Sequence, residues 1–167
     1  MREASPGWAR WLAVSALVVV LDLATKAWVS AVFAPGEGRD VTPFLRMVLV
    51  YNKGAAFSFL ADAGGWQRWF FTAIAIVIAV VIVVALRRQR DPLVAAALAL
   101  VLGGALGNLW DRLTLGHVVD FVLVHWNEHA FPAFNVADSA ITLGVAALLW
   151  ESVRPKSGAL PAPREEA

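Results

Sequence analysis

Four long apolar stretches constrain this chain more than any other feature of its sequence. Each has about the 20 residues that an α-helix needs to cross a bilayer core of roughly 30 Å. Hydrophobic residues make up 59% of the 167 residues and charged residues only 16%, whereas a soluble domain is about a quarter charged. The pattern predicts an all-α polytopic membrane protein with four transmembrane helices, at about 11–33, 69–86, 93–110 and 137–153.

The spans indicate a single membrane-embedded domain over residues 1–155. A Pro-, Ala- and Glu-containing tail at 156–167 is predicted to be disordered and cytoplasmic. A cleaved signal peptide is an alternative interpretation of the first stretch, because Arg10 precedes an apolar run that ends near Leu21. Hydrophobicity resumes after Asp22 and Lys26, and no clean small-residue cleavage site follows the run. The sequence therefore favours a transmembrane helix.

Basic residues predict the orientation of the four helices. Lys and Arg gather on the cytoplasmic side of membrane proteins. Here they flank the first helix, fill the short link between the second and third, and follow the fourth: Arg2, Arg10, Arg87, Arg88, Arg90, Arg154 and Lys156. Both termini are therefore predicted to be cytoplasmic. Tryptophans then mark both interfaces, with Trp8, Trp11 and Trp150 inside and Trp28, Trp66, Trp69 and Trp110 outside.

Two segments, 34–68 and 111–136, would then face outward. The first contains a strand-like run at 44–50, a turn at Asn52-Lys53-Gly54 and a possible return strand at 55–60. We expect a small extracytoplasmic β-element between the first and second helices. In the second segment, Asp120 is interpreted as an acid in an apolar outer loop.

Charged residues at membrane depth are costly and are functional candidates by default. Asp22 and Lys26 lie four residues apart on the first helix, so they share a face and can form an ion pair. We interpret this pair as structural or supporting. Gly103 and Gly107 form a small-xxx-small pair on the third helix, which predicts close approach of another helix.

The other informative polar residues come from three separate stretches but fall at one membrane face. They are Asn52, Asn108, Asp111, Arg112, Asp120, Asn135 and Asp138. Some have simple structural explanations, since Asn135 is a good N-cap and an acid at Asp138 suits the first turn of a helix. Arg112 could reach lipid phosphate or orient a carboxylate. Their gathering at one face nevertheless predicts one convergent site.

The residue types present narrow the chemistry of such a site. The chain has no cysteine, which excludes thiolate catalysis, disulfides and Cys-based metal sites. Its three histidines, His117, His125 and His129, lack metal-site spacing, so neither a metal nor another cofactor is expected. A net charge of +1 suggests no nucleic-acid partner. A Ser–Lys pairing with Lys26 stays open, but carboxylates predominate, and two that share a proton can perform aspartic-peptidase chemistry.

Five motifs together resemble lipoprotein signal peptidase, also called signal peptidase II. They are DLATK at 22–26, YNKGAAFS at 51–58, GGALGNLWDR at 103–112, VVDF at 118–121 and FNVADS at 134–139. The resemblance covers residues 10–150, in the family's order and spacing. It implies a four-helix aspartic peptidase of the bacterial inner membrane, with a β-cradle and its active site on the periplasmic face. The implied activity removes the signal peptide from prolipoproteins, cutting before a diacylglyceryl-modified cysteine.

The resemblance also implies roles for individual residues. Asp120 and Asp138 would be the catalytic dyad, Asp111 would support the site, and the ion pair of Asp22 and Lys26 would be structural. Asn52, Asn108, Arg112 and Asn135 would line the site and hold the substrate or the dyad. Lys53 departs from the small polar residue expected in the turn. Diacylglyceryl-modified prolipoproteins and membrane lipids are the expected partners of a monomer, and inhibition by the cyclic peptide globomycin is implied.

Two other functions compete with this interpretation. A transporter or ion channel would use Asp22 and Lys26 as part of a polar path. The second helix offers only Thr72 for such a path, so no continuous route is evident. A non-catalytic membrane assembly factor would instead rely on the glycine face of the third helix, and it would tolerate carboxylate-to-amide changes.

Overall fold

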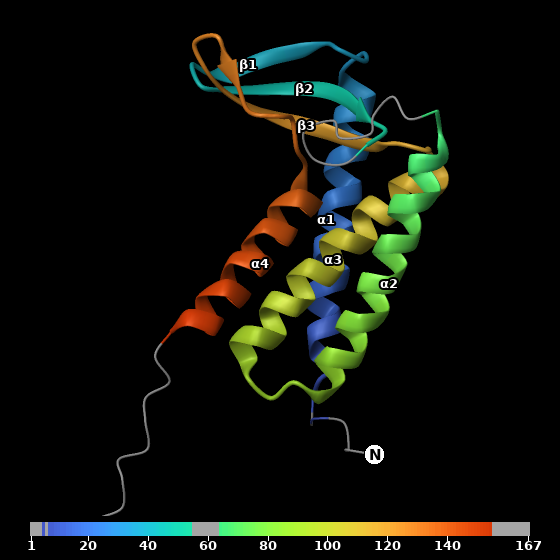
Figure 1. Cartoon of the computed structure of the whole chain (residues 1–167). Helices are drawn as coiled ribbons and strands as arrows, with labels where there is room; N and C mark the ends of the chain where they lie inside the picture. Colours follow the sequence, from blue (N-terminus) through green and yellow to red (C-terminus); the bar gives the residue numbers. More distant parts are fainter. Residues whose placement is uncertain (1–4, 6, 55–63, 155–167) are drawn as a thin grey trace, which may run out of the picture.

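Four helices form a bundle, and a small antiparallel sheet covers one end of it, here called the sheet end (Figure 1). The computed structural model describes residues 5, 7–54 and 64–154. The helices are α1 (Arg10–Val32), α2 (Trp66–Arg88), α3 (Pro92–Thr114) and α4 (Val136–Val153). All four are long and apolar enough to cross a membrane, which confirms the four predicted spans. Helix α3 is central, since it contacts the other three.

The ends of α3 and α4 follow from local sequence signals. Asp91 precedes α3, and its side chain accepts hydrogen bonds from the backbone N–H groups of Leu93 (2.8 Å) and Val94 (3.2 Å). Pro92 occupies the first helical turn, where its missing N–H costs nothing. Asn135 caps α4 as predicted and forms a reciprocal capping box with Asp138. The cap matters for function because it places both side chains at the sheet end.

The sheet has the order β1–β2–β3–β4, with antiparallel pairing between neighbours. Strands β1 (Gly38–Thr42) and β2 (Leu45–Asn52) confirm the predicted β-element between α1 and α2. Strands β3 (Val118–Trp126) and β4 (His129–Ala130) come from the segment between α3 and α4, so the interpretation of that segment as a loop was wrong. The β-branched and aromatic residues of β3 suit a strand. The predicted return strand at 55–60 and the predicted tail at 156–167 lie outside the described residues.

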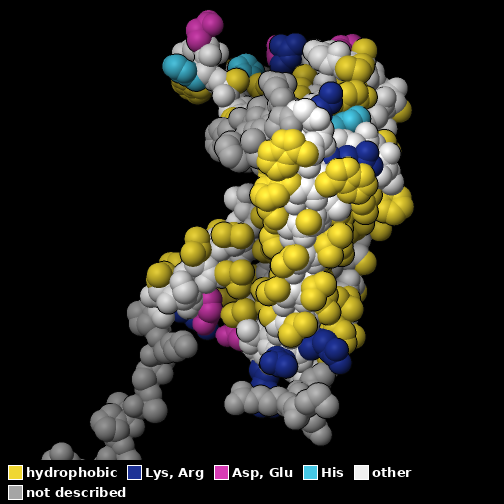
Figure 2. Space-filling view, turned by 45° about the vertical axis from the view of Figure 1, so that its right-hand side comes forward, with side chains coloured by type: hydrophobic (Ala, Val, Ile, Leu, Met, Phe, Trp, Pro, Cys, Tyr) yellow, Lys and Arg dark blue, Asp and Glu magenta, His cyan; other side chains and the backbone are white. Residues whose placement is uncertain are grey.

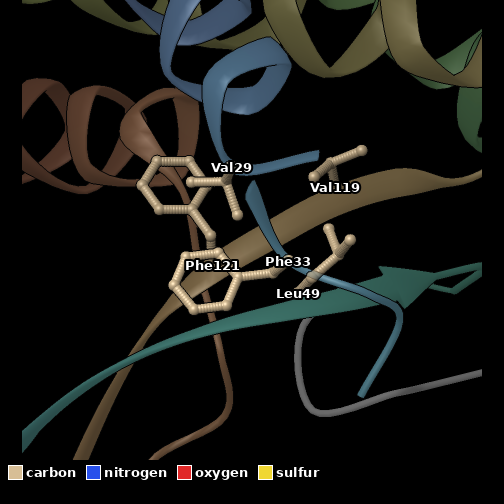
Figure 3. Close-up of a cluster of buried hydrophobic side chains, with 5 residues drawn as sticks. All are labelled: Val29, Phe33, Leu49, Val119 and Phe121. Atoms are coloured by element: carbon tan, nitrogen blue, oxygen red, sulfur yellow. The ribbon is translucent and has the colours of Figure 1, made fainter. Parts of the chain in front are cut away.

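An apolar cluster fixes the sheet onto the end of α1 (Figure 3). Val29 comes from the last turn of α1, Phe33 directly follows that helix, Leu49 comes from β2, and Val119 and Phe121 come from β3. All five are buried. Full burial of an apolar side chain of this size contributes roughly 1.5–3 kcal/mol. The cluster therefore fixes the position of β3 relative to the helix bundle. It also fixes Asp120, which lies between Val119 and Phe121.

Glycines bring α3 close to α1, as the small-xxx-small pair predicted. A Cβ atom at Gly103 would lie 2.7 Å from the Cβ of Val18, and one at Gly107 would lie 2.6 Å from Asp22 Oδ2. Real Cβ atoms are essentially never found so close to another heavy atom. The absence of side chains at these positions therefore allows α3 to pack directly over the buried carboxylate of Asp22.

The outer surface of the bundle is apolar over the length of the helices. Figure 2 shows hydrophobic side chains along the visible helices, with Lys and Arg side chains at both ends of the molecule. Trp66 and Trp69 are exposed at the start of α2, and Arg87 and Arg88 lie in its last turn. Aromatic residues at one boundary and basic residues at the other are typical of a helix that contacts lipid.

Candidate active site

Asp120 is the third residue of β3 and is buried, with only 2% of its surface exposed. Its neighbours Val119 and Phe121 pack into the apolar cluster. Since successive side chains of a strand alternate, Asp120 points away from that cluster. Its two carboxylate oxygens each accept a hydrogen bond from an amide: Oδ1 from Asn135 Nδ2 (2.8 Å) and Oδ2 from Asn52 Nδ2 (3.0 Å).

Asn52 ends β2 and reaches Asp120 because of the register between β2 and β3. The pairing shifts between Met47 and Val50, and beyond this irregularity Val50 lies opposite Asp120. Such irregularities re-aim side chains. The side-chain oxygen of Asn52 accepts the backbone N–H of Gly54 (2.9 Å). This contact orients the amide so that its nitrogen, which can only donate, faces Asp120.

Asn135 and Asp138 enter the site at the start of α4. The residue before Asn135, Phe134, forms an antiparallel bridge with Val122 of β3, which brings the helix N-terminus beside Asp120. Asn135 is fully buried. Asp138 Oδ2 accepts the backbone N–H of Asn135 (3.3 Å), and Asp138 Oδ1 accepts Asn108 Nδ2 from α3 (2.8 Å). Asp138 is therefore both a capping residue and part of the polar site.

Burial raises the pKa of Asp120 from 3.8 to about 7. Removal from water is the largest cause, because it penalises the charged form, and the negative charge of Asp138 adds to it. The amide donors Asn52 and Asn135 and the positive charge of Lys26 oppose the rise, since each favours the ionised carboxylate. Asp120 is consequently able to hold or release a proton near neutral pH.

Arg112 lies in the last turn of α3 and joins the same site. Its guanidinium donates to the carbonyl oxygens of Gly54 (3.1 Å) and Asn108 (3.3 Å). The positive charge of Arg112 is also attracted by the carboxylates of Asp138 and Asp120. These hydrogen bonds hold the Arg112 guanidinium against the protein at the site.

Lys26 connects α1 to the site through three contacts. Its ammonium lies 2.6 Å from Asp22 Oδ2, 2.9 Å from Asp111 Oδ2 and 3.0 Å from Asn108 Oδ1. Lys26, Asp22 and Asp111 are all buried. The pair of Asp22 and Lys26 was expected from its spacing, but the two contacts to α3 were not. The only sequence signal for them was the presence of charges at membrane depth.

The histidines lie apart from the carboxylate site or at its edge. His117 stacks on Tyr51 with ring centroids 4.2 Å apart, and burial lowers the pKa of His117. His125 Nε2 lies 4.0 Å from Asp40 Oδ1 on the sheet. Among residues 5, 7–54 and 64–154, no three His, Asp or Glu side chains are grouped so that they could hold a metal ion.

The structure thus gathers the predicted site residues at the sheet end. A sequence model of the family described as signal peptidase (SPase) II matches residues 14–154, which include all of them. The chain belongs to the signal peptidase II family. It is therefore a peptidase, and its four apolar helices make it a multi-pass membrane protein.

Similar proteins agree with this family assignment along most of the chain. A lipoprotein signal peptidase of Pseudomonas aeruginosa is 55% identical over 150 residues, which cover 87% of this chain and 89% of that protein. One from Paraburkholderia phymatum is 50% identical over 152 residues, covering 90% and 92%. A solved bacterial membrane enzyme structure superimposes with a TM-score of 0.80 at 29% identity and covers 96% of this chain and 99% of its own.

Proposed function

We propose that this signal peptidase II family member is a membrane-embedded aspartic endopeptidase. It removes the signal peptide from diacylglyceryl-modified prolipoproteins and cleaves N-terminal to the lipid-modified cysteine. The observation that carries the proposal is the pair of carboxylates Asp120 and Asp138, which are held at one end of a membrane bundle by side-chain amides. The relatives named lipoprotein signal peptidase support the substrate class.

The environments of the two carboxylates divide their roles. Burial and the neighbouring negative charge raise the pKa of Asp120 to about 7, so below about pH 7 Asp120 holds the proton that the pair shares in the resting enzyme. Asp138 lies in the first turn of α4, where the helix dipole favours a negative charge. Asp138 is therefore the general base and Asp120 the general acid.

Hydrolysis then proceeds with one shared proton. Asp138 takes a proton from a water molecule, whose oxygen attacks the scissile carbonyl carbon, while Asp120 gives its proton to the carbonyl oxygen. The resulting tetrahedral diol collapses as the carbon–nitrogen bond breaks. Asp138 then protonates the departing amine, and Asp120 recovers a proton from the diol. The pair ends with the single proton with which it began, as two close carboxylates require.

The remaining polar side chains hold this geometry and the substrate. Asn52 and Asn135 orient Asp120, and Asn108 orients Asp138, through the hydrogen bonds described above. In this proposal Arg112 binds a substrate carbonyl beside the dyad. We infer that the sheet end faces the periplasm and that both termini are cytoplasmic, because Arg87, Arg88 and Arg90 crowd the short link between α2 and α3 at the opposite end. The cleavage point of a lipid-anchored substrate would lie at that outer surface.

Cleavage of a purified prolipoprotein tests the proposal. The protein in detergent should release the signal peptide from a diacylglyceryl-modified prolipoprotein but not from the unmodified precursor. Asp120→Asn and Asp138→Asn should each lower the rate by at least about 10²–10⁴-fold, because each removes one half of the acid–base pair. The rate should depend on pH as a bell whose limbs belong to the pair.

Two other aspartates provide controls. Asp40→Asn removes an exposed carboxylate of β1 and should leave the rate unchanged. Asp111→Asn should weaken activity less than either dyad change. Retention of substantial activity by Asp120→Asn together with its loss in Asp111→Asn would transfer the acid–base role to Asp111 and contradict the proposed dyad.

A further inference from the structure

The buried ion cluster of Lys26, Asp22 and Asp111 reaches both members of the proposed dyad. The cluster is defined by the two short contacts of the Lys26 ammonium, at 2.6 Å to Asp22 and 2.9 Å to Asp111. An isolated ion pair that only joins two helices needs no further partners. Here each carboxylate has a second contact, and each contact leads toward one dyad residue.

The two carboxylates of the cluster bind the backbone next to the dyad. Asp111 Oδ2 accepts the N–H of Val119 (3.1 Å), the residue before Asp120. Asp22 Oδ1 accepts the N–H of Ala137 (2.9 Å), the residue before Asp138. A charged acceptor makes these hydrogen bonds stronger than neutral ones. The backbone of β3 and the first turn of α4 are therefore fixed to the same ammonium group.

The third contact of Lys26 determines how Asn108 is oriented. The ammonium donates to Asn108 Oδ1 (3.0 Å), which also accepts Asn135 Nδ2 (3.2 Å). Because its oxygen is held in this way, the amide nitrogen of Asn108 faces Asp138, and Nδ2 donates to Asp138 Oδ1 (2.8 Å). An ammonium has three N–H donors and no acceptor. Its two ion pairs and its hydrogen bond to Asn108 surround the ammonium with three oxygen atoms, within a side chain that is only 3% exposed.

We propose that Lys26 is a positioning residue for catalysis, which sets the relative placement of Asp120 and Asp138 through Asp111, Asp22 and Asn108. This inference rests on the proposed function. It extends the structural role expected for the pair of Asp22 and Lys26, because the cluster fixes the reacting carboxylates and not only the helices. It predicts that disturbing Lys26 slows the chemical step even in protein that remains folded.

Two variants of Lys26 separate positioning from folding. Lys26→Arg keeps the buried positive charge, so the bundle should still form, but a planar guanidinium cannot direct three donors as an ammonium does. The double variant Lys26→Met with Asp22→Asn removes one charge of each sign and keeps the net charge of the cluster. Because a displacement of about 1 Å can cost about 10²-fold in rate, kcat should fall about 10- to 100-fold in both variants, with KM little changed.

Ser15→Ala provides the matched control on the same helix. Ser15 is buried and donates to the carbonyl oxygen of Ala99 on α3 (2.8 Å), so it joins α1 to α3 without contacting the dyad network. Its loss should lower the melting temperature and leave kcat unchanged. All proteins are compared as the monodisperse fraction from size-exclusion chromatography in detergent, with helical content measured by circular dichroism and rates measured on the diacylglyceryl-modified prolipoprotein.

The outcomes distinguish the two hypotheses. If the wild-type protein does not cleave the substrate, the proposed function fails. If the wild type cleaves it but folded Lys26→Arg keeps kcat within about twofold, Lys26 is only structural and the inference is overturned. A rise in KM at unchanged kcat would also overturn it, because Lys26 would then contribute to substrate binding. If the double variant does not fold, Lys26→Arg alone decides the result.

Discussion

Replacing Asp120 by asparagine should change the stability of the protein in opposite directions at low and high pH. The wild-type carboxyl has a pKa of about 7 in the folded protein against 3.8 without the fold. Below about pH 4, both the folded and the unfolded chain hold the proton, and burial of Asp120 brings no ionisation cost. Between about pH 4 and 7 Asp120 keeps its proton only in the folded chain, so wild-type stability falls as pH rises.

The size of the effect follows from the raised pKa. A rise of about three pKa units corresponds to about 4 kcal/mol of wild-type stability that is fully lost above pH 7. Asparagine does not ionise, so the variant avoids this cost. It does place an amide nitrogen against one of the two amide donors, Asn52 or Asn135, which leaves a buried donor without an acceptor and costs about 1–3 kcal/mol. The variant should therefore be less stable than wild type at pH 4 and more stable at pH 8.

Denaturation in detergent at several pH values measures this crossing. The free energy of unfolding of Asp120→Asn minus that of wild type should increase by about 4 kcal/mol from pH 4 to pH 8. Asp40→Asn, which removes an exposed carboxylate, serves as the control and should follow the wild type at both pH values. A difference for Asp120→Asn that stays constant over this range would refute the argument that burial keeps Asp120 protonated.

Three further predictions concern other parts of the molecule. Reporter fusions after Gln89 should indicate the cytoplasm and those after Gly64 the outside, and the reverse pattern would contradict the orientation derived from basic residues. Gly104→Ala should lower the melting temperature, at a cost of about 1–3 kcal/mol, because its Cβ would collide with the backbone of α4; unchanged stability would show that α4 moves aside freely. Asn52→Ala removes a donor that favours the ionised form of Asp120, so the pKa of Asp120 should rise and the alkaline limit of the cleavage rate should move to higher pH; a shift to lower pH would contradict this.

The β-element shows where sequence patterns were insufficient. The strand at 44–50 was predicted from its own residues and corresponds to β2 (Leu45–Asn52). Strand β1 has a mostly polar and exposed sequence, and it pairs with β2 through backbone groups that no side-chain pattern reports. Strand β3 has β-branched residues, but the acid near its start, Asp120, led to its interpretation as a loop. Asp120 is tolerated in that strand because Asn52 and Asn135 satisfy both of its oxygens.

The sequence by itself determined the four membrane spans, the cap of α4 and the glycine face of α3. These features depend on residues close together in the chain, such as a run of about 20 apolar side chains or an N-cap with its partner three residues later. It also singled out the polar residues of the site, because charged and amide groups near a bilayer are conspicuous against an apolar background.

Only the tertiary structure decided which of those polar atoms meet. Asn52 and Asp120 are 68 residues apart and come into contact through the shifted register of β2 and β3. Lys26 and Asn108 are 82 residues apart and come into contact where α1 packs against α3. Strand register and helix packing are set by many simultaneous contacts across the whole fold. A spacing along one helix can therefore predict that Asp22 pairs with Lys26, but not that the same ammonium also binds α3 and is linked to both carboxylates of the site.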